Sequence, residues 1–194
     1  MKNFAFDHNG QTLWFSRSIA CSMYLFVRER LTGKWYVLVS KRGPGCPSAV
    51  GKWNVPGGYL DFDETLEDAA KRECFEETGV KVTEKVTLAS ISTDLKSKKQ
   101  NVVCSFYAMR EVSDISEIRS QFTYDHGENN EVDDIDLWEV DYFFNYPKTA
   151  AYDMAFGHDK MIREIFNKRI NIGLVSKYII DTADKITKID LEIQ

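Results

Sequence analysis

The chain has little cysteine and no long hydrophobic run, and each shortage excludes a class of protein. Four cysteines occur among 194 residues, and no two of them are spaced C-x-x-C, so the sequence predicts neither a zinc site nor a disulfide framework. No apolar stretch is long enough to cross a bilayer, and the first residues, Met1 to His8, lack the apolar core of a secretion signal. We therefore expect a cytoplasmic protein with reduced thiols.

An excess of basic charge is also absent. The chain has 25 lysines and arginines against 30 aspartates and glutamates, which gives a net charge of −5. Proteins that bind nucleic acid without specificity, or that bind anionic membranes, need a basic surface that this composition does not supply. We expect neither DNA nor a membrane as a partner.

The remaining composition is that of a globular protein, with 43% hydrophobic and 28% charged residues. There is no internal repeat and no linker rich in proline, glycine or serine. The length suits one domain over residues 1–194, with an extra C-terminal segment at about 167–194.

The order of strands and helices indicates an α+β fold with a mixed sheet. Runs rich in aromatic and β-branched residues predict the strands, and apolar periodicity predicts the helices. Expected strands are 12–16, 19–27, 34–41, 53–56, 82–95, 102–110 and 136–143. Expected helices are 64–78, 152–166 and part of 174–189, and residues 111–134 are expected to be an irregular loop.

Residues 64–78 form the clearest helical pattern, with acids near the start and Gly79 just past the end. Successive side chains on a helix are turned by about 100°. Thr78 is then expected to face outward, and one face is expected to pack on the protein interior. The members of that face are Leu66, Ala70 and Cys74.

Carboxylates share this inward face. Glu73 and Glu77 project onto it, and Glu76 lies close to its margin. Buried carboxylates are costly unless cations pair with them, protons neutralise them or a divalent metal binds them. Their i, i+3, i+4 spacing lets all three converge on one ion, and hard oxygen ligands favour Mg²⁺ or Mn²⁺. The alternative is a solvated acidic face that is salt-bridged by Arg72 or Lys71.

The segment GYLDFDETLEDAAKRECFEETGV resembles the box of the Nudix hydrolase family, G-x5-E-x7-R-E-U-x-E-E-x-G-U, in which U is bulky and apolar. Cys74 stands at the first U position, which is a mild departure because a buried thiol behaves as a small hydrophobe. The resemblance is strict over Trp53–Val80 and looser over about Ile19–Phe166. The matching positions are Gly58, Glu64, Arg72, Glu73, Glu76, Glu77, Gly79 and Val80.

The resemblance implies a Nudix fold, in which a mixed β-sheet lies between α-helices and the box forms a loop–helix–loop. It also implies metal-dependent hydrolysis of the pyrophosphate bond of a nucleoside diphosphate linked to another moiety, by attack of water on phosphorus.

Site roles follow from the same resemblance, position by position. Arg72 is expected to orient a box glutamate, Glu64 to brace the loop–helix–loop, and Gly79 to support its structure. Glu76 or Glu77 is also expected to bind metal-bound water. The expected ligands of Mg²⁺ or Mn²⁺ are Glu73, Glu76, Glu77 and the carbonyl of Gly58.

Some candidates lie outside the box. Glu131 and Glu128 precede Trp138 in a region from which many relatives recruit an extra metal ligand or general base, although a solvated acidic loop is the alternative. Arg42 and Lys41 end a strand and could reach a phosphate or sugar of the substrate, or could simply be an exposed strand end. His158 and its neighbour Asp159 are expected to support the fold.

Two other functions stay open. One is a non-catalytic nucleotide sensor or regulator with a Nudix fold, and the other is processing of RNA ends, which needs a basic groove. No proline occurs between Val80 and Tyr146, and a proline after the box marks one subfamily that hydrolyses ADP-ribose. Members of the family are often homodimers, but no feature of the sequence demonstrates one.

Overall fold

The computed structural model describes residues 4–15, 18–93, 102–123 and 130–171. The strands are β1 (Phe4–His8), β2 (Gln11–Phe15), β3 (Ile19–Glu29), β4 (Trp35–Arg42), β5 (Trp53–Asn54), β6 (Gly57–Tyr59), β7 (Thr87–Thr93), β8 (Val102–Val112) and β9 (Val132–Glu139). The helices are α1 (Leu66–Thr78), α2 (Ser116–Arg119), α3 (Val140–Asn145), α4 (Pro147–Asp153) and α5 (His158–Ile165), which a π-helical turn, Phe166–Asn171, extends.

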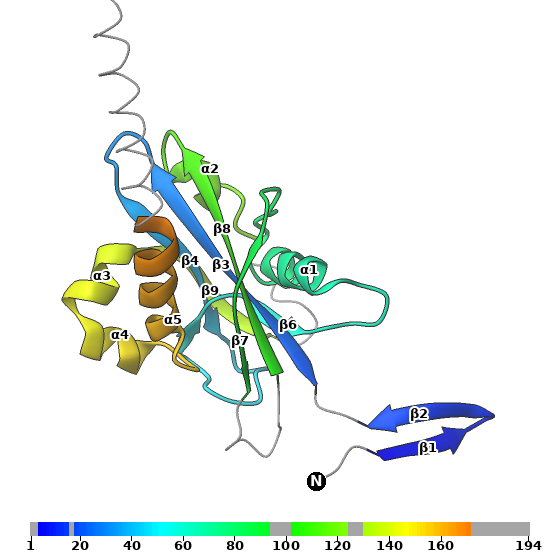
Figure 1. Ribbon diagram of the computed structural model, residues 1–194. Coiled ribbons are helices and arrows are strands. Elements are labelled where there is room, and N and C mark those ends of the chain that lie inside the picture. The colour runs from blue at the N-terminus through cyan, green and yellow to red at the C-terminus, as the bar shows by residue number, and fades with distance from the viewer. Residues whose placement is uncertain (1–3, 16–17, 94–101, 124–129, 172–194) are drawn as a thin grey trace, which may run out of the picture.

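A seven-stranded mixed sheet forms the body of the protein. Its main path is β5-β4-β3-β8-β7, with β6 paired to β3 and β9 paired to β4. β3 and β8 run parallel from the pair Ile19 and Val102 to the pair Glu29 and Val112, and the other pairs are antiparallel. Helix α1 lies on one face, and helices α3, α4 and α5 lie on the other (Figure 1). The expected sheet between helices is therefore confirmed.

Central strand β3 divides the apolar core in two. Its side chains alternate between the faces, so Met23 and Leu25 pack in the core under α1, whereas Tyr24 and Phe26 pack under α3 to α5. This explains the unbroken apolar run in the sequence, because a central strand covered on both faces has no polar side.

Helix α1 begins two residues later than expected. Thr65 caps it: its Oγ1 accepts a hydrogen bond of 3.2 Å from the N–H of Asp68 and donates one of 2.7 Å to the Asp68 carboxylate. Glu64 therefore stands before the helix. The expectation that Thr78 faces outward is wrong, since it is fully buried and donates a 2.5 Å hydrogen bond to the Cys74 carbonyl. Gly79 ends the helix in the left-handed conformation, as expected.

Several other helix and strand boundaries differ from those expected from the sequence. β7 begins at Thr87 rather than at residue 82, and β9 ends at Glu139, after which the chain turns directly into α3. The helix expected at 152–166 is interrupted, because Gly157 takes a φ of 74° before α5. The supposed loop 111–134 contains the end of β8, α2 and the start of β9.

Toward the N-terminus the structure contains a strand that the sequence did not predict, and one predicted helix cannot be compared. β1 was not anticipated, and it pairs with β2 in a hairpin that stands apart from the main sheet (Figure 1). The helix expected within 174–189 lies outside the described residues. Among the helices that the structure describes, none is long and apolar enough to span a bilayer.

Candidate functional site

The box begins against the central strand. β6 pairs with β3, placing Gly58 opposite Cys21. A Cβ atom on Gly57 would lie 2.5 Å from the Cys21 carbonyl oxygen, and a Cβ atom on Gly58 would lie 2.5 Å from a carboxylate oxygen of Glu73. Gly57 therefore requires glycine, because backbone atoms of β3 occupy the space, whereas a methyl group at Gly58 would displace the Glu73 carboxylate. The backbone of Gly58 thus lies next to the side chain of Glu73. The resemblance to the Nudix box assigns both residues to one metal site.

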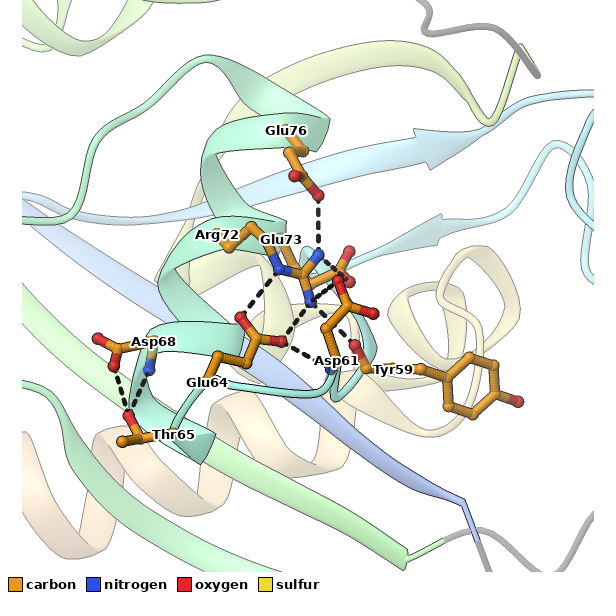
Figure 2. A network of polar contacts seen from close by, with 8 residues as sticks. All are labelled: Tyr59, Asp61, Glu64, Thr65, Asp68, Arg72, Glu73 and Glu76. Atoms are coloured by element: carbon orange, nitrogen blue, oxygen red, sulfur yellow. Dashed lines mark hydrogen bonds and ion pairs between the residues drawn. The ribbon is translucent and has the colours of Figure 1, made fainter. Parts of the chain in front are cut away.

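Arg72 is the centre of a network of carboxylates (Figure 2). Its Nε and one terminal nitrogen bind both oxygens of Glu64, at 3.0 and 2.8 Å. The other terminal nitrogen donates to Glu73 at 2.8 Å and to Glu76 at 2.9 Å. A further bond of 2.9 Å reaches the carbonyl of Tyr59, so one guanidinium ties the box loop to the box helix.

The network shifts the pKa values of its members in opposite directions. The hydrogen bonds from Arg72 and from the Asp61 N–H hold the pKa of Glu64 below its usual value. The hydrogen bonds that Arg72 donates to Glu64 raise the pKa of Arg72, which stays charged. Glu64 is thus fixed as an anion that positions Arg72, which is the bracing arrangement that the box resemblance leads us to expect.

Glu73 and Glu77 are the carboxylates for which burial dominates. The side chain of Glu73 is 15% exposed, and desolvation raises its pKa despite the bond from Arg72. Burial also raises the pKa of Glu77, to about 7. Glu77 accepts hydrogen bonds from Ser40 Oγ at 2.7 Å and from the Gly57 N–H at 3.3 Å. Within the described ranges, no lysine or arginine nitrogen forms an ion pair with Glu77.

Glu76 differs from the other two candidate ligands, because its side chain is 55% exposed and, among the described residues, bound by Arg72 alone. No three His, Cys, Asp or Glu side chains are grouped as a ready-made metal cage in the part of the chain that the structure describes. The donors nevertheless fit Mg²⁺ or Mn²⁺, because all are hard oxygens and exposed Glu76 has room to turn. The part-buried Glu73 and Glu77 have raised pKa values, so nearby positive charge does not fully offset the cost of desolvating them.

The basic candidates lie at the end of β4. Lys41 forms a 2.8 Å ion pair with Asp133, and hydrogen bonding to Asp133 raises its pKa. Arg42 donates from Nε to the Ser48 carbonyl at 3.0 Å. Its charge is near enough to lower the pKa of Glu77, although burial outweighs this effect. Arg42 is thus near enough to Glu77 to act on its charge, while Lys41 is held by Asp133.

The acidic candidates before β9 are only partly described. Glu131 is exposed, and its carbonyl oxygen accepts a 2.7 Å hydrogen bond from the Gly43 N–H. The Cys46 thiol in the loop 43–52 donates a 3.1 Å hydrogen bond to the same Glu131 carbonyl oxygen. Burial is the main cause that raises the pKa of this thiol, and the charges of Glu131 and Glu77 add smaller effects in the same direction. Glu128 lies outside the described residues.

The expected fold-supporting pair is well placed for that role. His158 Nδ1 accepts a 3.1 Å hydrogen bond from the N–H of Val55, just before the box. Burial, with a smaller effect from Arg42, lowers the pKa of His158 to about 4. Its neighbour Asp159 is buried and bound to Arg163 at 2.9 Å.

Sequence reasoning missed Ser40, which anchors Glu77, and Asn54, whose Oδ1 accepts a 3.3 Å hydrogen bond from the same hydroxyl. The sequence did contain a signal for Ser40, since it is a polar residue within the apolar run YVLVSK. A buried hydroxyl needs a partner, but the sequence does not say which one.

Comparison with known proteins agrees with this arrangement. The model of the NUDIX domain family matches residues 18–165. Phosphatase NudJ of Escherichia coli (strain K12) is 61% identical over 28 residues, which are 14% of this chain and 18% of NudJ. The match thus spans less than a fifth of that curated relative.

Solved structures share the fold over most of their length. The NUDIX domain of Shewanella oneidensis NrtR, complexed with ADP ribose, has a TM-score of 0.58 at 19% identity, covering 79% of this chain and 89% of that one. A mutT/nudix family protein from Listeria innocua has a TM-score of 0.57 at 21% identity, with 84% and 97% covered. A Caenorhabditis elegans Ap4A hydrolase binary complex has a TM-score of 0.53 at 18% identity, with 76% and 94% covered. With most of its length matched by the family model, the chain belongs to the NUDIX domain family.

Proposed function

We propose that the protein is a metal-dependent hydrolase that cleaves the pyrophosphate bond of a nucleoside diphosphate linked to another moiety. The observation that carries this proposal is the state of Glu77. Its side chain is part-buried, and its carboxylate is held by Ser40 and Gly57. It has no ion-paired cation among the described residues, and it lies on the same side of α1 as the part-buried Glu73. A site that confines acids in this way is suited to a divalent ion.

Glu73, Glu76, Glu77 and the carbonyl of Gly58 are the proposed ligands of Mg²⁺ or Mn²⁺. When bound, the ion would offset phosphate charge and lower the pKa of a water molecule.

The chain's other groups supply position. Glu64 holds Arg72 through two hydrogen bonds, and Arg72 donates a third to Glu73. Arg42 offers positive charge to a phosphate next to Glu77, and Lys41 is a second candidate on the same strand end. Glu131 is the proposed general base, since it is exposed and its backbone contacts the loop 43–52 that follows Arg42.

A nucleotide sensor without catalysis is the second candidate function. It is favoured by one observation, the fold shared with the ADP-ribose-bound NUDIX domain of NrtR, a protein that has also been crystallised with a 27mer DNA. At 19% identity, this likeness supports a shared fold and nothing beyond it. Cytoplasmic location and homodimer formation stay predictions under either function.

The test is a panel of nucleoside diphosphate sugars, dinucleotides and nucleoside triphosphates, assayed with and without Mg²⁺ or Mn²⁺, with products identified. We expect metal-dependent release of a phosphorylated product and a loss of about 100-fold or more in Glu77→Gln. The matched control is Glu164→Gln, an exposed glutamate on α5, which should retain full activity. Tight nucleotide binding without turnover would instead support the sensor.

A further inference from the structure

Phe156 is an exposed aromatic residue in an unfavourable backbone conformation. It lies between α4 and α5, is 64% exposed, and has a φ of 57°, a left-handed value that bulky residues avoid. The adjoining backbone is fixed, because the Ala155 N–H donates a 2.7 Å hydrogen bond to the Trp53 carbonyl. Strain of this kind persists where surrounding structure imposes it, and it concentrates at functional sites.

Two neighbours orient the Phe156 ring. The guanidinium carbon of Arg42 lies over the ring, 5.0 Å from its centroid, and the part-buried His158 ring meets it at 5.7 Å and 63°. Arg42 is itself held by the Ser48 carbonyl. The phenyl and guanidinium groups therefore form a fixed stacking pair, Arg42 with Phe156, at the protein surface.

The stacking pair belongs to the same strand end as the anchor of Glu77. Ser40, which binds Glu77, is two residues before Arg42 on β4. β5 pairs with this part of β4, and Trp53 of β5 holds the residue that precedes Phe156. When the phosphates of a ligand lie at Glu77, the stacking pair is therefore close to one end of that ligand.

We propose that the stacking pair is the platform for the nucleobase of the substrate. Planar bases stack on aromatic rings and on guanidinium groups, and the arginine adds positive charge for the adjacent phosphate. This inference rests on the proposed function and narrows it: the substrate carries an aromatic base on at least one side of its diphosphate, and a diphosphate without a base lacks this contact.

Another exposed phenylalanine provides the matched control. Phe62 lies in the box loop and is 98% exposed, so its ring is not held by packing. If a base bound to Phe62, this mobile ring would lose conformational entropy, which weakens binding. The Phe156 ring is already held in place, so it does not incur this cost. Removal of either ring takes away the same chemical group, but only Phe156 is braced beside the site.

The test measures binding to the full chain, so that it does not depend on turnover. The variants are Phe156→Asn, whose side chain tolerates the left-handed conformation, Phe156→Trp, which restores a ring, and Phe62→Asn. The probes are ADP and inorganic pyrophosphate, titrated by calorimetry with Mg²⁺ present. Thermal unfolding of each variant establishes that the fold is retained.

We expect Phe156→Asn to weaken ADP binding at least about fivefold and to leave pyrophosphate binding within about twofold. Phe156→Trp should bind ADP as the unmodified chain does, and Phe62→Asn should change neither probe. Unchanged ADP binding by Phe156→Asn, or equal loss of both probes, overturns the platform. If the platform is supported but no substrate is hydrolysed, the proposed function fails and the platform stands.

Discussion

Ser40 on β4 donates a 2.7 Å hydrogen bond to Glu77 on the box helix, across 37 residues of sequence. The hydroxyl is almost fully buried, so the bond is shielded from water and holds the carboxylate in one orientation. The position of a candidate metal ligand is thus set by the sheet as well as by its own helix.

Ser40→Ala removes this donor. We expect a stability loss of about 1–2 kcal/mol and a metal affinity lowered by about tenfold, because partners of ligating carboxylates orient them. Urea unfolding and calorimetric titration with Mn²⁺ measure the two effects. Ser105→Ala, which breaks a buried hydrogen bond between Ser22 on β3 and Ser105 on β8, should lower stability without altering metal affinity. Equal metal affinity in both variants would contradict the positioning role.

Glu77→Gln should weaken metal binding without lowering the free energy of unfolding of the metal-free protein. Without metal, the variant should be at least as stable as the unmodified chain, since it removes a buried charge that has no ion-paired cation among the described residues. Mg²⁺ at about 100 times its Kd should stabilise the unmodified chain by about 2.7 kcal/mol and the variant by much less. Thermal unfolding over a series of MgCl₂ concentrations measures this. Equal stabilisation of both proteins would rule out Glu77 as a ligand.

Alanine at the two box glycines should have different consequences. In Gly58→Ala the new methyl group meets the Glu73 carboxylate, which can turn away, so the fold should survive while activity falls by about tenfold or more. In Gly57→Ala it meets the backbone of β3, which cannot move cheaply, so stability should fall by about 2 kcal/mol or more. Activity assays and chemical unfolding on both variants give the comparison; the reverse ranking would refute it.

Arg72→Lys keeps the positive charge but loses the planar fork that binds Glu64 through two bonds. We expect a stability loss of about 1–3 kcal/mol and activity reduced at least about tenfold. Arg119→Lys is the control, because the exposed Arg119–Asp136 pair should change stability by less than about 0.5 kcal/mol. Similar unfolding free energies for the two variants would show that the network adds nothing to the fold.

His158 should make stability fall in mild acid. Its pKa drops from 6.5 to about 4 on folding, so between these values the unfolded chain takes up a proton that the folded chain does not. This contribution to stability is complete above about pH 6.5 and declines by up to about 3 kcal/mol as the pH falls to about 4 and below. The charged Arg42, the Tyr24 ring and the neighbouring Asp159 face the same region.

His158→Asn supplies an oxygen that can still accept the Val55 N–H but does not titrate. The unfolding free energy of the variant, measured by urea between pH 4 and 7, should therefore depend less on pH. Parallel curves for the two proteins would mean that the buried histidine is not the cause.

Much of the site was predictable because it is encoded locally. The box spacing identified Glu64, Arg72, Glu73, Glu76 and Glu77, and the structure brings Arg72 into contact with three of these carboxylates. Element boundaries were less predictable: a single cap at Thr65 moved the start of α1, and a left-handed Gly157 divided the last expected helix.

By itself, the sequence determined the family, the box helix and the central strand, because helical and strand periodicity, caps and motif spacing depend on neighbouring residues. Only the tertiary structure decided that Ser40 holds Glu77, that His158 binds the backbone of Val55 just before the box, and that Arg42 stacks on Phe156. These contacts join segments from 37 to more than 100 residues apart, and which of many polar side chains meet at that range depends on how the sheet and its two helical layers pack.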